Sequence, residues 1–136
     1  MTRDGGRALP LRLLLADDSA GFLAALCAYL LDYPQVAVVG TAASGEQAIA
    51  LSERLAPDVV VMDLAMPGIG GIEATRDLKT RARAPTVLVL TLDARESMRR
   101  AALEAGADFF VAKDRLHEDF PAVLAQLENG KNGVRS

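Results

Sequence analysis

The sequence predicts an α/β fold, in which a doubly wound parallel sheet of five strands is flanked by five helices. Short apolar runs alternate along the chain with segments of helical periodicity. The runs are nearly continuous in Val and Leu, which is typical of strands covered on both faces. Five successive strand–helix units favour a parallel sheet with right-handed crossovers. The length of 136 residues fits one such domain.

The first two strand–helix units have clear start signals. The runs Leu11–Ala16 and Val36–Ala42 predict the first two strands. Ser19 and Ser44 are suited to cap the helices that follow, and Gln47, three residues after Ser44, completes a capping box. The first helix is expected to turn one apolar stripe to the core, made of Phe22, Ala25, Leu26, Tyr29 and Leu30.

The remaining strands are predicted at Val59–Met62, Thr86–Leu90 and Asp108–Ala112. Gly106 stands where the fourth helix needs a residue of left-handed conformation to end it. Three prolines stop a helix or precede a strand, namely Pro34, Pro57 and Pro85. The last helix has its own apolar stripe, formed by Leu116, Phe120, Val123, Leu124 and Leu127.

The two ends of the chain are predicted to lie outside the folded domain. Residues 1–10, with two adjacent glycines, are predicted to form a flexible arm, and residues 129–136 a polar tail. Residues 11–128 are therefore expected to make up the single folded domain.

Composition restricts the classes of function. Fifteen Lys and Arg against 18 Asp and Glu give a formal charge of −3, which argues against a broadly basic nucleic-acid binder. A single cysteine, Cys27, forms no disulfide within the chain. The longest apolar stretch, Phe22–Leu31, is too short to span a bilayer, and the N-terminal segment is wrong for a signal peptide. We therefore expect a cytoplasmic protein without a membrane partner.

Five polar residues follow or end predicted strands. Asp17 and Asp18 come after the first strand, Asp63 after the third, Thr91 after the fourth and Lys113 after the fifth. In a sheet of order 2-1-3-4-5 these four strands are contiguous, so all five residues meet at one edge, where such sheets bind ligands. Carboxylates about 4 Å apart repel by roughly 4 kcal/mol at an effective dielectric constant of about 20. Lys113 and a divalent metal are the candidates to offset this repulsion, and oxygen ligands in an open site favour Mg²⁺.

This set of residues is suited to phosphoryl transfer. Asp63 would attack phosphorus as the nucleophile. The metal and Lys113 would neutralise charge on the phosphoryl oxygens, and Thr91 would donate a hydrogen bond to one of them. Each residue alone is more often a strand-end cap or part of a surface ion pair. Five compatible residues at four strand ends favour the functional interpretation.

At these residues the sequence resembles a two-component response-regulator receiver domain over about Leu11 to Leu127, and Pro34–Ile49 resembles the NarL-like subfamily. The matching segments are Leu14–Asp18, Val59–Gly68, Val89–Thr91 and Gly106–Lys113. The resemblance implies the flavodoxin-like receiver fold.

The resemblance also implies a role for each site residue. Asp63 would be the phosphoacceptor and would bind Mg²⁺ together with the Asp18 carboxylate and the Ala65 backbone carbonyl, while Asp17 would act through a metal-bound water. Thr91 and Phe110 would be the switch pair, whose movement alters the surface around the fourth helix. The donor would be a sensor histidine kinase, a phosphotransfer protein or a small phosphodonor such as acetyl phosphate.

Three residues depart from the family pattern. Leu92 stands where a small residue is usual and is expected to narrow access to the acceptor. Asp114 stands where many receivers have proline, so the usual cis peptide is not expected. Gly70 replaces a common acidic residue. None of these departures removes a catalytic group.

Two surfaces are candidates for partner contacts. Arg95, Arg99 and Arg100 form a basic face on the fourth helix, which we interpret as a partner or dimer surface rather than only a solvated face. Leu23, Cys27 and Leu31 form a second apolar stripe on the first helix. Partial burial is the simpler explanation for this stripe, and docking of the kinase is the alternative hypothesis.

We therefore expect a Mg²⁺-dependent phosphorylation switch that modifies only itself and turns over no separate substrate. It would control a signalling or transcriptional output through a homodimer or an output protein. DNA would be a partner only if a helix-turn-helix domain were missing from this chain. The main alternative is a receiver that works as a binding module without phosphorylation. A small aspartyl-phosphate phosphatase is disfavoured, because Asp63 is followed by Leu64 and Ala65 and not by the usual Asp-x-Asp pattern.

Overall fold

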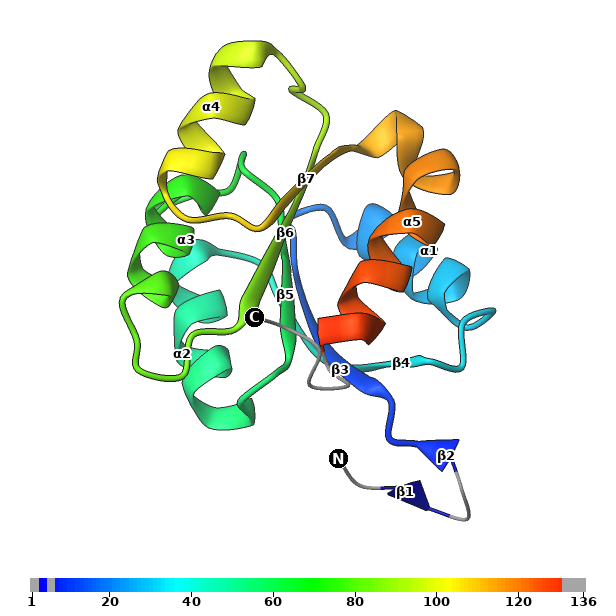
Figure 1. Ribbon diagram of the computed structural model, residues 1–136. Coiled ribbons are helices and arrows are strands. Elements are labelled where there is room, and N and C mark those ends of the chain that lie inside the picture. The colour runs from blue at the N-terminus through cyan, green and yellow to red at the C-terminus, as the bar shows by residue number, and fades with distance from the viewer. Residues whose placement is uncertain (1–2, 5–6, 131–136) are drawn as a thin grey trace.

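A computed structural model describes residues 3–4 and 7–130. A central sheet is covered by helices on both faces, so the molecule has three layers (Figure 1). The elements of this domain are β3 (Leu11–Ala16), α1 (Ala20–Leu30), β4 (Val36–Ala42), α2 (Gly45–Leu55), β5 (Val59–Met62), α3 (Gly71–Lys79), β6 (Thr86–Thr91), α4 (Glu96–Glu104), β7 (Phe109–Ala112), the short 3₁₀ helix η1 (Lys113–Arg115) and α5 (Leu116–Asn129).

The five strands are all parallel and lie in the order β4-β3-β5-β6-β7. Counted along the domain, this order is 2-1-3-4-5, and the predicted fold is confirmed. β3 and β5 lie at the centre, where the crossover direction reverses. Such sheets bind their ligands at the carboxyl ends of these central strands.

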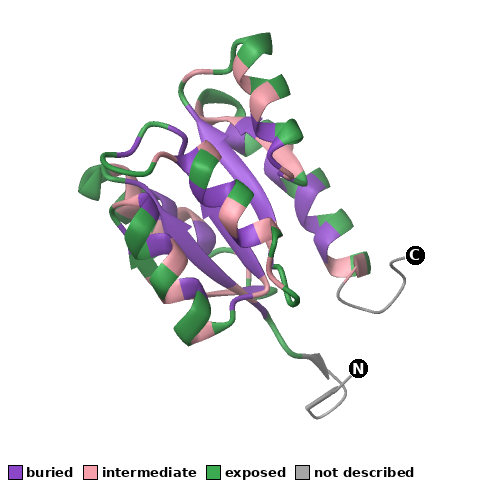
Figure 2. Ribbon diagram, turned by 90° about the vertical axis from the view of Figure 1, so that its left-hand side faces the viewer, coloured by how far each residue is buried: buried purple, intermediate pink, exposed green. Residues whose placement is uncertain are grey.

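Each face of the sheet has its own apolar core. Alternate strand residues point to opposite faces, so Leu13 and Leu15 pack under α1 and α5, whereas Leu14 packs under α2, α3 and α4. Figure 1 shows these helix groups on opposite sides of the sheet, and Figure 2 shows the strands buried between them. Strands buried on both faces account for the continuous apolar runs in the sequence.

The predicted caps are confirmed in the structure. The hydroxyl groups of Ser19 and Ser44 accept hydrogen bonds from the backbone N–H groups at the starts of α1 and α2, each at 3.1 Å. Gln47 differs from a standard capping box, because its side chain accepts from the N–H of Ala43 and not from that of the cap residue. Gly106 has a φ of +109°, as its predicted place after α4 requires.

Two predicted details are wrong. Asp108 lies before β7, and its carboxylate accepts from the Val87 N–H and from the Lys79 ammonium, both at 2.9 Å. Because the Asp108 side chain makes these two hydrogen bonds, Asp108 anchors the chain just before β7 and is not itself part of the strand. Ala25, assigned to the core stripe of α1, is exposed, because the contact with the sheet is made by the larger Leu26 and Leu30.

The chain ends were predicted to be an arm and a tail. Within residues 1–10, Arg3–Asp4 (β1) and Arg7–Ala8 (β2) pair as a short antiparallel ladder. Residues 1–2, 5–6 and 131–136 lie outside the described part of the chain, and the flexibility predicted for both ends stays a prediction. Helix α5 continues through Asn129, one residue beyond the predicted end of the domain. In the described part of the chain, no helix is long and apolar enough to cross a membrane.

Gly71, the first residue of α3, lies against the backbone of the β5–α3 loop. A Cβ atom built on Gly71 would come within 2.1 Å of the Asp63 carbonyl oxygen, and one built on Gly21 in α1 would meet nothing within 4 Å. A side chain at position 71 would therefore collide with the backbone, whereas one at position 21 would not, so Gly21 is a suitable control for Gly71.

We predict that Gly71→Ala lowers the free energy of unfolding by about 1–3 kcal/mol, because the added methyl group displaces backbone atoms. Gly21→Ala should leave this free energy unchanged or raise it by up to about 1 kcal/mol, because alanine favours a helix. Urea unfolding followed by circular dichroism measures both. Equal effects of the two substitutions would contradict the close approach at Gly71.

Candidate functional site

The predicted polar residues lie at the carboxyl ends of four neighbouring strands. Asp17 follows β3, Asp63 follows β5, Thr91 is the last residue of β6, and Lys113 follows β7. Asp17, Asp63 and Thr91 are all buried, at 3%, 5% and 1% exposure. Buried polar side chains at one edge of the sheet distinguish this region from an ordinary surface.

Asp17 is held from both sides. One carboxylate oxygen accepts a hydrogen bond from the Ser19 backbone N–H at 2.8 Å. The other accepts from the Lys113 ammonium at 2.6 Å. Because the side chains of Asp17 and Lys113 are only 4% and 9% exposed, water screens this ion pair poorly.

Asp63 occupies the centre of the site. Its backbone N–H donates to the Ala16 carbonyl at 2.9 Å, which continues the β3–β5 pairing to the site. Its carboxylate lies 3.7 Å from the Lys113 ammonium. Burial raises the pKa of the Asp63 carboxyl, and the neighbouring Asp17 carboxylate raises it further, while Lys113 and the Ala65 backbone act in the opposite direction. Lys113 thus offsets the repulsion only in part.

The carboxylates of Asp17, Asp18 and Asp63 form a cluster whose ligand atoms all lie within 4.8 Å of one another. Oxygens that share one Mg²⁺ ion lie about 3–4 Å apart, so small side-chain movements bring this cluster to that geometry. Asp18 is exposed, which leaves the cluster open to solvent on one side. An open site of oxygen ligands fits Mg²⁺, and the exposed residue Ala65 lies two residues beyond Asp63.

The hydroxyl oxygen of Thr91 accepts a hydrogen bond from the Asp93 N–H at 3.2 Å. Its own O–H remains a donor, because a hydroxyl donates and accepts at the same time. Phe110 lies on β7, pairs with Val89 of β6, and packs half-buried against the core under α2, α3 and α4. Both predicted switch residues therefore lie on the two strands beside α4.

The three departures from the family pattern lie near this edge. Leu92, directly after Thr91, is 81% exposed, so its side chain does not fill the core. Asp114 is also exposed, and the described residues contain no cis peptide bond. Gly70 is the N-cap residue of α3 and makes no side-chain cap.

Sequence reasoning missed two residues around the site. Phe22 was assigned to the core stripe of α1, but the Lys113 ammonium lies over its ring, 4.0 Å from the centroid. Glu46, at the start of α2, accepts from the Ile69 N–H at 3.2 Å and so joins α2 to the β5–α3 loop. No local pattern signals either contact, because the partners are far apart in the sequence.

Two exposed carboxylates lie beside the arginines that are predicted to form a basic face on α4. Arg95 pairs with Asp93 at 2.6 Å, and Arg99 and Arg100 lie 3.9 and 3.8 Å from Glu96. Asp93 and Glu96 thus lie beside the three arginines as exposed ion pairs, and the interpretation of this face as a partner or dimer surface stays a prediction.

The second apolar stripe of α1 is divided in the structure. Leu23 and Cys27 are half-buried and pack against the core, whereas Leu31 is 83% exposed. Partial burial thus accounts for two of the three residues. Docking of the kinase on this stripe stays a prediction.

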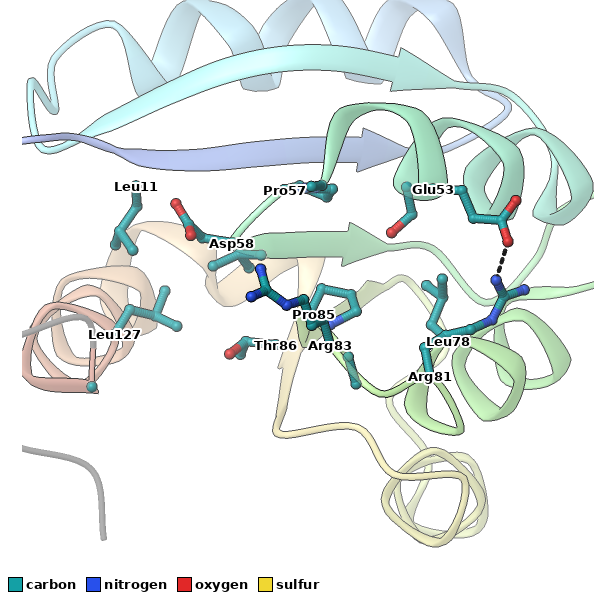
Figure 3. A pocket seen from close by; sticks show the side chains of 15 residues that line it. Leu11, Glu53, Pro57, Asp58, Leu78, Arg81, Arg83, Pro85, Thr86 and Leu127 are labelled. Atoms are coloured by element: carbon teal, nitrogen blue, oxygen red, sulfur yellow. Dashed lines mark hydrogen bonds and ion pairs between the residues drawn. The ribbon is translucent and has the colours of Figure 1, made fainter. Parts of the chain in front are cut away.

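A groove of about 640 Å³ opens at the opposite edge of the sheet, between the starts of the strands and the ends of α2, α3 and α5 (Figure 3). Its charged residues include Glu53, Asp58, Arg81 and Arg83, and Arg81 is ion-paired to Glu53. The groove therefore lies at the amino ends of the strands, away from the acidic cluster. The buried carboxylates and Lys113 make the carboxyl ends of the strands the better candidate for the functional site.

Comparison with known proteins identifies the family of this chain. The family model described as the response regulator receiver domain matches residues 13–125. The nitrate/nitrite response regulator protein NarL of Escherichia coli is 34% identical over 122 residues, which cover 90% of this chain and 56% of that protein. A protein-glutamate methylesterase/protein-glutamine glutaminase of Methanospirillum hungatei is 40% identical over 99 residues, covering 71% of this chain and 28% of that protein.

Among solved structures, the isolated receiver domain of RcsB from Salmonella enterica serovar Typhimurium, in the presence of the phosphomimetic BeF₃⁻, is 27% identical with a TM-score of 0.81. The match covers 89% of this chain and 90% of that one. The chain thus spans about half the length of NarL and about a quarter of that of the methylesterase.

The raised pKa of Asp63 makes stability depend on pH. As the pH rises from the ordinary carboxyl pKa of 3.8 through the higher pKa of the folded state, the folded protein loses stability relative to the unfolded chain. Asp63→Asn removes this charge. Without metal, we therefore predict that the variant has a higher Tm than the wild type near pH 7.

Calorimetry at pH 7 and below pH 4 measures this effect, which should shrink at the lower pH. Asp114→Asn is the control, since Asp114 is an exposed carboxylate outside the cluster. An Asp63→Asn protein no more stable than the wild type at pH 7 would show that Lys113 fully offsets both the burial of the Asp63 charge and its repulsion by Asp17.

Proposed function

This chain belongs to the response regulator receiver domain family, and we propose that its Asp63 accepts a phosphoryl group in a Mg²⁺-dependent reaction. The observation that carries the proposal is the buried Asp63 carboxylate, which lies within reach of two further carboxylates and of the Lys113 ammonium. An anionic centre that is only partly neutralised is suited to bind a divalent cation.

Phosphoryl transfer requires few steps from this chain. An Asp63 carboxylate oxygen forms the new bond to phosphorus, and the bond from phosphorus to the donor breaks. With a phosphohistidine donor, the imidazole nitrogen leaves with the electron pair and is protonated from solvent. The product is an acyl phosphate on Asp63, which water later hydrolyses to restore the carboxylate and release inorganic phosphate.

Asp18, Asp63 and the Ala65 carbonyl would hold the Mg²⁺, with Asp17 acting through a bound water. When bound, the ion supplies positive charge to the phosphoryl oxygens. The Lys113 ammonium lies 2.6 Å from the Asp17 carboxylate and 3.7 Å from that of Asp63. On phosphorylation it would move from Asp17 to a phosphoryl oxygen on Asp63. Support for this movement comes from the short distance that separates its two carboxylate partners.

Thr91 would convert the new charge into a change of surface. Its hydroxyl accepts from Asp93 and keeps its own proton to donate to a phosphoryl oxygen. A movement of Thr91 pulls on the β6–α4 loop through Asp93, and Phe110 on the neighbouring strand adjusts to the space that Thr91 leaves. The surface of α4 is thus the part that we expect to change.

The phosphoryl donor that we propose is a sensor histidine kinase or a phosphotransfer protein in the cytoplasm, with small phosphodonors as substitutes. The output is a signalling or transcriptional one, reached through an output protein, a second copy of the chain or, in a longer protein, a DNA-binding segment. The two relatives differ in this respect, because one is named a response regulator and the other a methylesterase.

The test is the mass of the intact protein after incubation with acetyl phosphate and Mg²⁺. One phosphoryl group per chain is expected for the wild type, and none for Asp63→Asn or in the presence of a chelator. Asp18→Asn should require a higher Mg²⁺ concentration, because it removes one ligand. If acetyl phosphate gives no adduct, binding of beryllofluoride, which needs no transfer step, decides the question. Failure of both would favour the alternative function, a binding module that works without phosphorylation.

Leu92 offers a second prediction. Its side chain is 81% exposed beside Thr91, so Leu92→Ala should change the free energy of unfolding by less than about 0.5 kcal/mol. It should speed both phosphorylation by acetyl phosphate and loss of the phosphoryl group by roughly two- to fivefold, because less apolar surface limits access to Asp63.

Phosphorylation and decay rates followed by mass spectrometry measure this change. Leu31→Ala is the matched control, since Leu31 is 83% exposed at the far end of α1. Rates for Leu92→Ala that equal those of this control would show that Leu92 does not limit access.

A further inference from the structure

We propose that Phe22 is a positioning residue, whose ring holds the Lys113 ammonium at the wall of the site while the ammonium changes its anionic partner. This inference rests on the proposed function, because it assigns Phe22 a part in the transfer of Lys113 from Asp17 to the phosphoryl group. The observation that carries it is the ammonium over the ring, at 4.0 Å from the centroid.

The Lys113 ammonium has partners of two kinds. Asp17 accepts a hydrogen bond from it at 2.6 Å, and Asp63 lies 3.7 Å away. The ring of Phe22 is the uncharged partner. With the Lys113 side chain only 9% exposed, little water competes for the ammonium. A cation over an aromatic face in such a setting is attracted by the ring quadrupole more strongly than at an exposed site.

The ring is fixed by the same turn that fixes Asp17. The Ser19 hydroxyl accepts from the Phe22 backbone N–H at 3.1 Å, and the Ser19 N–H donates to the Asp17 carboxylate at 2.8 Å. The N-cap of α1 therefore sets the positions of Asp17 and of Phe22 together. Lys113, from the other end of the domain sequence, fits between them.

The two kinds of partner behave differently when Asp63 is phosphorylated. The hydrogen bond to Asp17 must weaken, since the ammonium is drawn to the new phosphoryl oxygens. The attraction to the ring has no strict donor–acceptor direction and holds the ammonium in the same region through this change. Without the ring, the four-carbon chain of Lys113 would have more conformations to search, and the reactive arrangement would be populated less often.

A simpler interpretation is that Phe22 only fills space, because its ring also packs against the core under α1 and α5. The two interpretations differ in what a leucine does at this position. Phe22→Leu keeps apolar volume but removes the aromatic face, whereas Phe22→Tyr keeps the face. A purely space-filling residue would be equally replaceable by either.

The experiment compares Phe22→Leu and Phe22→Tyr for phosphorylation by acetyl phosphate with Mg²⁺, each alone and combined with Lys113→Gln. We expect Phe22→Leu to slow phosphorylation roughly fivefold and Phe22→Tyr to stay within about twofold of the wild type. In the Lys113→Gln background, Phe22→Leu should have no further effect, because the group that it positions is gone. An equal slowing with and without Lys113, or no slowing at all, would overturn the proposal.

A second measurement needs no phosphorylation and uses the wild-type chain. An ammonium held over the ring places the neighbouring Lys113 methylene protons in its ring current, so their NMR signals should lie upfield of ordinary lysine positions. Unshifted signals would overturn the proposal even if every variant folds poorly. If the wild type takes up neither a phosphoryl group nor beryllofluoride, the proposed function fails, and this shift alone decides whether Phe22 holds Lys113.

Discussion

Repulsion between carboxylates at the end of the central strands is the constraint on which the rest of the site depends. The carboxylates of Asp17, Asp18 and Asp63 lie within 4.8 Å of one another, and two of them are almost fully buried. The folded chain tolerates this charge because Lys113 reaches across from the end of β7. The balance is incomplete, since burial and then the neighbouring Asp17 carboxylate keep the pKa of Asp63 raised in spite of Lys113. An incomplete balance leaves the site able to gain from a further cation, which a fully paired network would not.

The fold holds this repelling cluster together through its backbone. Asp63 continues the β3–β5 pairing through its N–H, and Gly71 allows the start of α3 to approach its carbonyl oxygen. On the other side of the loop, a Cβ on Gly45 would lie 1.9 Å from the Ile69 carbonyl oxygen, and Glu46 accepts from the Ile69 N–H. The loop that carries Ala65 is thus held between α2 and α3. Positions set by the backbone do not depend on the charges that the side chains carry.

The same arrangement links the site to one face of the domain, the surface of α4. Thr91 ends β6 and accepts from the backbone of Asp93, so it is tied to the loop that enters α4. Asp93 and Glu96 in turn pair with the arginines of that helix. A displacement of Thr91 would therefore act on the ion pairs around α4, whereas α2 and α3 contact the loop beside Asp63. The groove at the amino ends of the strands lies at the opposite edge from these contacts.

The sequence by itself determined the layout of this protein. Continuous apolar runs, serine caps and a glycine after α4 define the order of strands and helices, because each depends on residues close together in the chain. The polar residues at the strand ends follow from that order, since parallel strands bring their carboxyl ends to one edge. Contacts between distant segments were decided only by the tertiary structure. The sequence assigned Phe22 to the core, against which it packs, but it gave no sign that Lys113 lies over the Phe22 ring or that Glu46 accepts from the Ile69 N–H. Side-chain direction and pairing depend on packing across the domain, which no local pattern encodes.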